Sequence, residues 1–349
     1  DVYIPVVPRE DLAEFIYHGD VAQEHDATAE VKNQREDYKG IYQHKIPESV
    51  RKYAQHIDDA LAHVKICDPA IGSGAFPVGV MNEIVRARGA LTSYLGSDGR
   101  TPYDFKRHAI QESIYGVDLE PSAVDIAKLR LWLSLVVDED DFGTIKPLPN
   151  LEYKILSGNS LLGIENNLFN SSEFRRLEKL KSRFFDETSP SQKLQLKKDI
   201  SSTIQKISGS GTQFDYEVYF SEVFHERGGF DFVIANPPYI NAKDNTEFDA
   251  TYRKLYSSAH GSYDVYVIFM EKSLSLLNRR GHINFITSNK WLVADYATKL
   301  REMILKKYQL VEVDDLADCR RIFESALVSP AISIIRKKSV AEDEFIFRK

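Results

Sequence analysis

Short apolar runs alternate with amphipathic stretches between Val64 and Arg336, and this alternation constrains the fold more than any other feature of the 349-residue sequence. Strand-like and helix-like segments in alternation are typical of a parallel sheet that is covered by helices. The runs that we interpret as strands cover residues 64–68, 114–118, 153–156, 230–235, 282–286, 310–313 and 331–336. The sequence therefore predicts an α/β fold with a doubly wound, seven-stranded, Rossmann-like sheet.

Helical spacing of apolar residues fills most of the intervals between these strands. It predicts helices over residues 76–86, 121–137, 263–277 and 294–307. Residues 166–222 interrupt the alternation, because apolar residues there recur at three- and four-residue spacing among many charged ones. These apolar positions are Leu177, Leu180, Phe184, Ile200, Ile204 and Ile207. We interpret this segment as a helical insertion containing a hairpin, and residues 1–63 as a helical N-terminal segment.

The composition is that of an ordinary globular protein, with 43% hydrophobic and 28% charged residues. The sequence has no apolar run of the roughly 18 residues that a membrane span needs, so no membrane association is expected. Two cysteines, Cys67 and Cys319, cannot build a disulfide framework, and the N-terminus does not resemble a secretory signal. A reducing, cytoplasmic location is therefore expected. Because the sequence opens with Asp1 instead of methionine, we interpret it as part of a longer polypeptide.

The formal net charge of −7 is distributed unevenly along the chain. From Asn236 to the end, 18 Lys and Arg face 15 Asp and Glu, a net charge of +3, which leaves −10 for residues 1–235. Nucleic-acid binding needs clustered basic residues that neutralise phosphates. A polyanion is therefore expected to meet the C-terminal third of the chain.

A glycine-rich turn follows the first predicted strand and precedes a predicted helix. Its sequence is Asp68-Pro69-Ala70-Ile71-Gly72-Ser73-Gly74-Ala75-Phe76. Glycines there let the backbone approach a ligand, and the start of a helix presents free N–H groups, so the turn suits a nucleotide-like ligand. Pro77 replaces the third glycine of a dinucleotide fingerprint, and no Gly-Lys-Ser/Thr follows. The alternative is a turn whose glycines serve tight packing alone.

Asp118 ends the second predicted strand, at the position where an acidic residue reaches ribose hydroxyls in doubly wound folds. Together with Asp68 it would make a pocket lined by carboxylates, which suits a cationic sulfonium better than a phosphate chain. The alternative role for Asp118 is to cap the helix that starts near Pro121.

The tetrapeptide Asn236-Pro237-Pro238-Tyr239 directly follows the strand at residues 230–235. Two prolines fix the backbone and remove two N–H donors, so the turn offers hydrogen-bond acceptors to an amino group. Tyr239 supplies a flat face on which a planar base can stack. The alternative is a rigid turn with a core tyrosine.

Four segments in this order resemble the amino-group DNA methyltransferases that use S-adenosylmethionine. The segments are Asp68–Phe76 (motif I), Gly116–Asp118 (motif II), Gly158-Asn159-Ser160-Leu161-Leu162 (motif III) and Asn236–Tyr239 (motif IV). The resemblance runs from about Val64 to Lys338, and the helical insertion is similar to that of large bifunctional restriction-modification enzymes. It implies a donor-binding half over residues 64–165 and a catalytic half over residues 223–349, separated by the insertion at 166–222.

The resemblance also implies which residues form the site. Those implied to bind S-adenosylmethionine are Asp68, Pro69, Ala70, Gly72, Gly74, Phe76, Asp118, Leu119, Asn159 and Ser160. Those implied to grip the flipped target base are Asn236, Pro237, Pro238, Tyr239 and Phe323. The family more often has Asp than Asn at position 159, and a plain core role competes with base stacking for Phe323.

The function that the resemblance implies is methyl transfer to N6 of adenine in double-stranded DNA, as the modification activity of a restriction-modification system. Direct displacement by the amino nitrogen needs no covalent enzyme intermediate. The nine histidines show no His-Glu-x-x-His or Cys/His metal spacing, so no structural zinc is expected. Target-recognition and possible nuclease regions would lie outside this sequence. The alternatives are a protein-glutamine N5 methyltransferase, N4-cytosine transfer, and a catalytically silent module that binds donor or DNA. Carbon-5 cytosine methylation is excluded, because Cys67 follows Ile66 and Cys319 follows Asp318 instead of proline.

Overall fold

The computed structural model describes residues 7–33, 46–96, 99–137, 147, 149–163, 171–208, 214–244, 246–317, 329–338 and 345–348. Packing divides the chain into two compact units. Unit 1 comprises Asp1–Val64, Val78–Ile114 and Leu131–Ile145, and unit 2 comprises Lys65–Pro77, Tyr115–Arg130 and Lys146–Lys349. The division of the sequence at residues 63, 165 and 222 stays a prediction.

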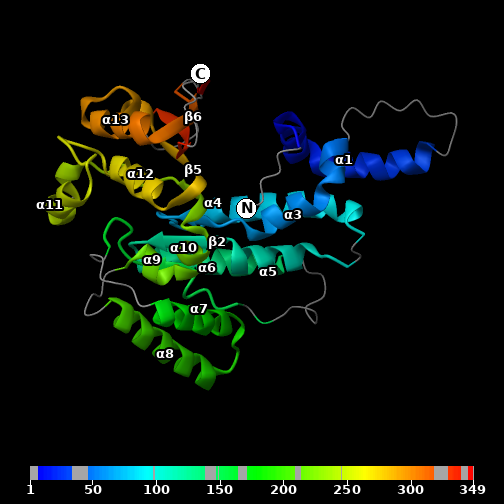
Figure 1. Cartoon of the computed structure of the whole chain (residues 1–349), viewed down its shortest axis with the longest axis horizontal. Coiled ribbons are helices and arrows are strands. Elements are labelled where there is room, and N and C mark those ends of the chain that lie inside the picture. The colour runs from blue at the N-terminus through cyan, green and yellow to red at the C-terminus, as the bar shows by residue number, and fades with distance from the viewer. Residues whose placement is uncertain are drawn as a thin grey trace. The chain divides into compact units, whose positions relative to one another are not determined.

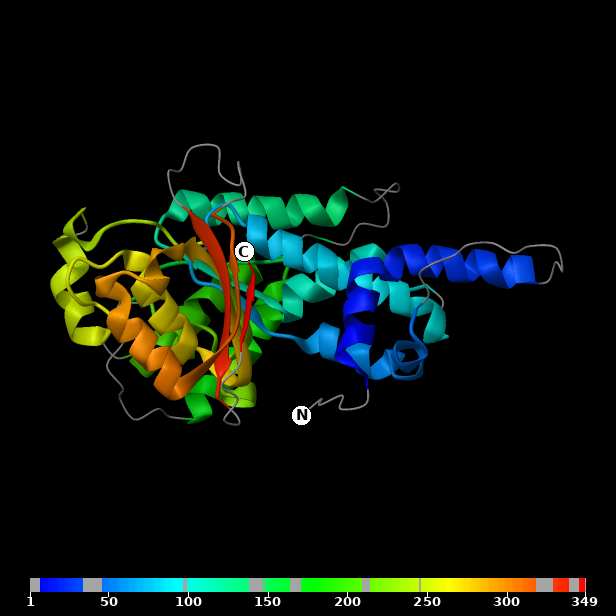
Figure 2. The same cartoon turned by 90° about the horizontal axis from the view of Figure 1, so that it is seen from above.

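An eight-stranded mixed sheet is the main element of unit 2. The strands are β1 (Ile66–Asp68), β2 (Ile114–Asp118), β3 (Ile155–Ser157), β4 (Phe230–Ala235), β5 (Leu277–Ser288), β6 (Tyr308–Asp315), β7 (Pro330–Lys337) and β8 (Ile346–Arg348). Their order is β3-β2-β1-β4-β5-β7-β6-β8, and β7 runs antiparallel to both of its neighbours. The predicted α/β fold with a Rossmann-like sheet is confirmed, and the long C-terminal strands lie side by side in Figure 2.

Two details of the sheet differ from the sequence-based prediction. β8 is an eighth strand that the sequence analysis did not predict; it comprises only three residues, all exposed, and pairs in parallel with β6. The helix predicted over residues 263–277 ends at Ser275, and β5 already begins at Leu277. No glycine or proline separates that helix from the strand, so the apolar pattern runs on without a break.

Helices pack around the sheet of unit 2 (Figure 1). They are the part of α6 (Pro121–Val136) up to Arg130, α7 (Ser171–Asp186), α8 (Pro190–Ser208), α9 (Tyr216–Tyr219), α10 (Ser221–Arg227), α11 (Thr246–Leu255), α12 (Val265–Ser275) and α13 (Thr298–Lys307). Helices α7 and α8 lie side by side and share an apolar cluster that includes Leu177, Phe184 and Ile200, as a hairpin requires. Among the described residues, no helix is both long and apolar enough to cross a membrane.

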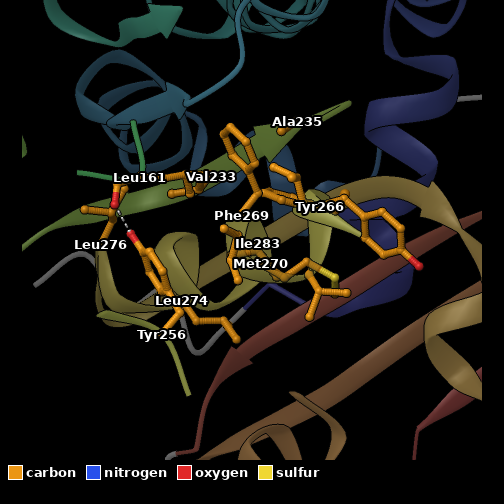
Figure 3. Packing of buried hydrophobic residues seen from close by; sticks show 14 of the residues in the cluster. Leu161, Val233, Ala235, Tyr256, Tyr266, Phe269, Met270, Leu274, Leu276 and Ile283 are labelled. Atoms are coloured by element: carbon orange, nitrogen blue, oxygen red, sulfur yellow. Dashed lines mark hydrogen bonds between the residues drawn. The ribbon is translucent and has the colours of Figure 1, made fainter. Parts of the chain in front are cut away.

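The main hydrophobic core of unit 2 lies between the sheet and helix α12. Figure 3 shows Val233 and Ala235 of β4 and Ile283 of β5 close to Phe269 and Met270 of α12. β4 and β5 are parallel neighbours, with Val233 opposite Ile283 and Ala235 opposite Phe285. Because these central strands are buried in the core, the turns that follow them start from a rigid base.

Unit 1 is helical. It contains α1 (Arg9–Asn33), α2 (Glu48–Lys52), α3 (Ala54–His63), α5 (Pro102–Glu112) and most of α4 (Ala75–Leu91). Its core includes Val50, Ala54 and Ile57, whose helical spacing is visible in the sequence. Asp58 is buried and accepts hydrogen bonds from Arg88 and Arg100, so a paired carboxylate crosslinks three segments of the unit.

Gly229 at the entry to β4 offers a direct test of the fold. It has φ +132°, and a Cβ atom there would lie 2.4 Å from the carbonyl oxygen of Leu276 and 2.8 Å from the amide nitrogen of Asn278. Both obstacles are backbone atoms, so a side chain displaces the start of β4 from β5. Gly229→Ala is expected to lower the free energy of unfolding by about 3 kcal/mol, measured by urea denaturation.

The neighbouring Gly228 is the matched control. It has φ +70°, but a Cβ atom there would meet no atom within 4 Å. Gly228→Ala therefore carries only the cost of a left-handed alanine, about 1 kcal/mol. Equal losses for the two variants would contradict the packing of Gly229 against β5.

Candidate active site

The glycine-rich turn of motif I begins at the buried carboxyl end of β1. Asp68 is 2% exposed, and its Oδ1 accepts a hydrogen bond from the amide of Ala70 at 3.0 Å. Gly72 and Gly74 have φ values of +51° and +78°, a region that side chains disfavour. A Cβ atom on Gly74 would lie 3.0 Å from the Cβ of Ala127, so this glycine also lets the turn approach α6 closely.

Asp118 ties motif II to motif I. Its Oδ2 accepts a hydrogen bond from the amide of Gly72 at 2.8 Å, and its Oδ1 accepts one from the amide of Glu120 at 3.0 Å. The second bond closes a turn just before α6, because Glu120 precedes the first helical residue, Pro121. The carboxylate also fixes the glycine turn, and each oxygen keeps a free lone pair for a further donor.

Motif III, which directly follows β3, is tied to both motif I and α11. Ser160 donates a hydrogen bond to the carbonyl of Pro69 at 2.6 Å. The Asn159 amide nitrogen donates to the Tyr252 hydroxyl at 3.1 Å, and its Oδ1 accepts from the amide of Leu161 at 2.9 Å. The Tyr256 hydroxyl donates to the carbonyl of Leu161 at 2.6 Å, the bond drawn in Figure 3. These contacts fix the orientation of the Asn159 side chain.

Motif IV starts one residue after β4, which is the parallel neighbour of β1 in the sheet. Cys67 lies opposite Val233, so Asp68 and Asn236 stand at the same carboxyl edge on strands that are hydrogen-bonded to each other. Adjacent strands are about 4.8 Å apart. Motifs I and IV are therefore neighbours in the sheet, although 159 residues lie between Phe76 and Asn236 in the chain.

Tyr239 holds the Asn-Pro-Pro-Tyr turn in place. Its hydroxyl lies 3.1 Å from Asn236 Oδ1 and 3.2 Å from the carbonyl oxygen of Ile286 in β5, to which it can donate. Burial raises the pKa of Tyr239 to about 12, so the hydroxyl keeps its proton and remains a donor. Its ring meets Tyr266 edge-on, with centroids 5.9 Å apart. Asn236 Oδ1 is thereby oriented and keeps a lone pair for another hydrogen.

A second layer of polar contacts fixes the chain just after the turn. Asn241 pairs with Asp264 through a β-bridge, and its amide nitrogen donates to Asp264 Oδ1 at 3.3 Å. Tyr296 donates to Asp264 Oδ2 at 3.1 Å, and its hydroxyl lies 2.7 Å from that of Tyr266. Motif IV is therefore anchored to β5 and to the start of α12.

The remaining predicted site residues differ in exposure. Phe76 and Leu119 are 42% and 63% exposed, which leaves two large apolar side chains at the surface beside the carboxyl edge. Pro237 and Pro69 are buried, Ala70 is half-buried and Pro238 is exposed. Phe323 lies outside the described residues.

Sequence reasoning missed the tyrosines that support the site, at positions 252, 256, 266 and 296. Their one visible signal is the density of tyrosines after motif IV, at 252, 256, 263 and 266. Density alone does not separate a role behind the site from ordinary core packing.

The turn of motif I has the electrostatics of a site for a cation. Burial raises the pKa of Asp68 to about 7, the Ala70 amide lowers it, and the negative charge of Asp118 raises it further. A positive ligand beside the two carboxylates offsets this repulsion and favours the ionised form of Asp68. The geometry thus combines a glycine turn, paired carboxylates and exposed apolar side chains, which together suit a cationic nucleoside.

Residues 112–323, more than half of the chain, match the Eco57I restriction-modification methylase family. The chain belongs to this family.

Comparison with curated proteins finds several long relatives. RM.MjaORFECS2P of Methanocaldococcus jannaschii is 26% identical over 82% of this chain and 31% of its own length. The adenine-specific methyltransferase PglX of Streptomyces coelicolor is 26% identical over 68% of this chain and 18% of its own length. The type II restriction enzyme and methyltransferase RM.Eco57I of Escherichia coli is 23% identical over 83% of this chain and 26% of its own length. The chain thus spans less than a third of the length of these relatives.

Among solved structures, the type IIL restriction-modification enzyme MmeI in complex with DNA shares the fold. The two chains superpose with a TM-score of 0.51 at 13% identity, over 99% of this chain and 37% of the other. At this identity the likeness concerns the fold alone.

Proposed function

We propose that this chain transfers a methyl group from S-adenosylmethionine to N6 of adenine in double-stranded DNA, after the base has flipped out of the helix. It would supply the modification activity of a restriction-modification system. The observation that carries the proposal is the placement of motifs I and IV at the carboxyl ends of adjacent parallel strands, β1 and β4. One ligand held by each motif would bring a donor and an acceptor together in a single site.

The residues around motif I fit the donor. Asp68 would face its positively charged methionine part, with Gly72 and Gly74 allowing close approach of the backbone. Asp118 keeps lone pairs for ribose hydroxyls, and Leu119 and Phe76 offer apolar surface to the adenine ring. Pro69 and Ala70 shape the turn, while Asn159 and Ser160 would line the other side of the donor pocket. When bound, S-adenosylmethionine supplies an activated methyl group.

Motif IV would hold the target base. Asn236 Oδ1 and the carbonyl of Pro237 accept the two hydrogens of the amino group, which keeps the nitrogen lone pair directed at the donor. Pro237 and Pro238 keep the turn rigid and remove competing donors. Tyr239 orients Asn236 and presents its ring to the base. We assign Phe323 to the opposite face of the base.

The chain's relatives suggest the setting of this reaction. Their greater length is compatible with target-recognition and nuclease regions elsewhere in the full protein, and we propose these as its partners together with DNA. Because the proposed substrate is the cell's own DNA, we place the reaction in the cytoplasm.

One experiment separates the candidate functions. The protein is incubated with methyl-labelled donor and unmethylated duplex DNA, the DNA is digested, and the labelled nucleoside is identified. Label in N6-methyladenine is the expected result. Label in N4-methylcytosine would show that cytosine is the target in place of adenine. Label in glutamine of a protein would favour the protein methyltransferase. Donor binding without transfer would favour a silent module.

A further inference from the structure

Helix α7 of the inserted hairpin has two opposite faces. The face toward α8 and the rest of unit 2 is buried and contains Phe174, Leu177, Lys181 and Phe184. The opposite face is exposed and contains Arg175, Arg176, Lys179 and Arg183. The first acidic residue on that exposed face is Asp186, at the end of the helix. The solvent-facing side of α7 is thus a basic stripe.

The charge of the hairpin contrasts with that of the chain. Residues 171–208 contain nine Lys and Arg against five Asp and Glu, a net charge of +4, whereas the whole chain has −7. This surplus of basic residues lies outside the C-terminal third, where the sequence led us to expect a polyanion. Within the described part of the chain, Arg176, Lys179 and Arg183 have no ion pair or side-chain hydrogen bond. Their charges are therefore available to a ligand.

Buried contacts fix the hairpin to the rest of unit 2. Lys181 donates to the carbonyl of Tyr219 at 2.6 Å and pairs with Glu222, which also lies 3.8 Å from Lys154. These opposite charges hold the pKa of Glu222 below its usual value despite its burial. Asn150 donates to the carbonyl of Phe184 at 2.6 Å. The stripe is therefore held in a constant position relative to β3.

Phe214, the first described residue after the hairpin, lies on the donor side of the site. A Cβ atom on Gly158 of motif III would lie 2.5 Å from the Cβ of Phe214, so Phe214 packs directly on motif III. A macromolecule bound along α7 would thus have a fixed relation to the pocket.

We propose that Arg176, Lys179 and Arg183 form a docking surface for the phosphate backbone of the DNA duplex whose adenine is methylated. The proposal rests on the proposed function, because that function supplies the polyanion. The three residues recur at i, i+3 and i+7 and span about 10 Å at 1.5 Å per residue. One strand of DNA carries a charge about every 3.4 Å along its axis, so the stripe matches roughly three phosphates.

The test is the triple substitution R176Q/K179Q/R183Q, which removes three charges and keeps side chains that favour a helix. Binding to a duplex is measured as a function of salt. The slope of log affinity against log salt is expected to fall by about 3, and the dissociation constant at physiological salt to rise at least about tenfold. Turnover at saturating DNA and the affinity for the donor stay at the level of the unsubstituted protein.

The matched control is K299Q/K306Q/K307Q on helix α13, which removes the same number of exposed charges from another face of unit 2. Its salt slope is expected to change by less than about 1. The charge-conserving variant R176K/R183K, which leaves Lys179 in place, should bind the duplex as the unsubstituted protein does, because phosphate contact needs charge and not a particular geometry. Thermal unfolding of each variant shows whether the fold is intact.

Two failures are distinguishable. If the unsubstituted protein labels no adenine, the proposed function is wrong. If it labels adenine normally but the α7 variant has the same salt slope and DNA affinity as the α13 control, the docking surface is wrong, and an acidic protein becomes the better partner for the stripe.

Discussion

Asn236→Ala is expected to lower methyl transfer by about 10²–10³-fold while the affinity for S-adenosylmethionine changes less than about twofold. Removal of one oriented hydrogen-bonding group at a reacting centre has a cost of that order. Asn236 makes its recorded side-chain contact with Tyr239 and none with Asp68, Gly72 or Asp118. Single-turnover transfer to duplex DNA and equilibrium binding of the donor measure the two quantities separately.

Two further variants sharpen the experiment on Asn236. Asn236→Asp keeps an oxygen acceptor and is expected to retain more activity than alanine. Asn289→Ala removes an amide from the same edge of the sheet, where it donates to Asp315 at 3.2 Å, and is expected to retain most activity. Loss of donor binding in Asn236→Ala would show that the donor and base pockets are assigned to the wrong motifs.

The sequence predicts well those strands whose ends are marked by residues next to them in the chain. β2 and β4 begin and end at the predicted residues, because apolar runs there stop at Asp118 and at Asn236-Pro237. The motifs follow from the same logic, since turns with unusual backbone demands use glycine and proline. Motif I and motif IV therefore stand out in one sequence without further information.

Other features depend on contacts between distant residues. The position of β7 between β5 and β6, and the parallel pairing of β8 with β6, are set by the packing of the whole sheet. The contact between Tyr252 and Asn159 joins residues that are 93 positions apart. Composition and periodicity carry no signal for such pairs, which is why the tyrosines behind the site emerged from the structure alone.

The affinity for S-adenosylmethionine is expected to rise about tenfold between pH 6 and pH 8. Burial and the charge of Asp118 raise the pKa of Asp68 to about 7, so a cationic ligand must select the ionised form. A group that must lose its proton to bind gives an apparent dissociation constant proportional to 1 + 10^(pKa − pH). Binding at pH 6 is therefore expected to release close to one proton, measured by calorimetry in buffers of different ionisation enthalpy.

The same group predicts how the stability of the ligand-free protein varies with pH. Its pKa is raised in the folded state, so the folded protein holds the proton more tightly than the unfolded chain does. The stabilising contribution is fully present below the unfolded value of 3.8 and is lost as the pH rises through about 7. Thermal unfolding with and without donor is expected to show the largest donor-induced stabilisation above pH 7.

Asp68→Asn is the control for this linkage, since it keeps an oxygen that can accept from the Ala70 amide but cannot ionise. Donor binding to this variant is expected to be weaker above pH 7. The donor's own amino group titrates in both proteins, so its contribution cancels when the two pH profiles are divided. A ratio of the two donor affinities that stays constant from pH 6 to pH 8 would mean that Asp68 does not face the charge of the donor. Asp68 and Asp118 would then stabilise the turn without binding the donor.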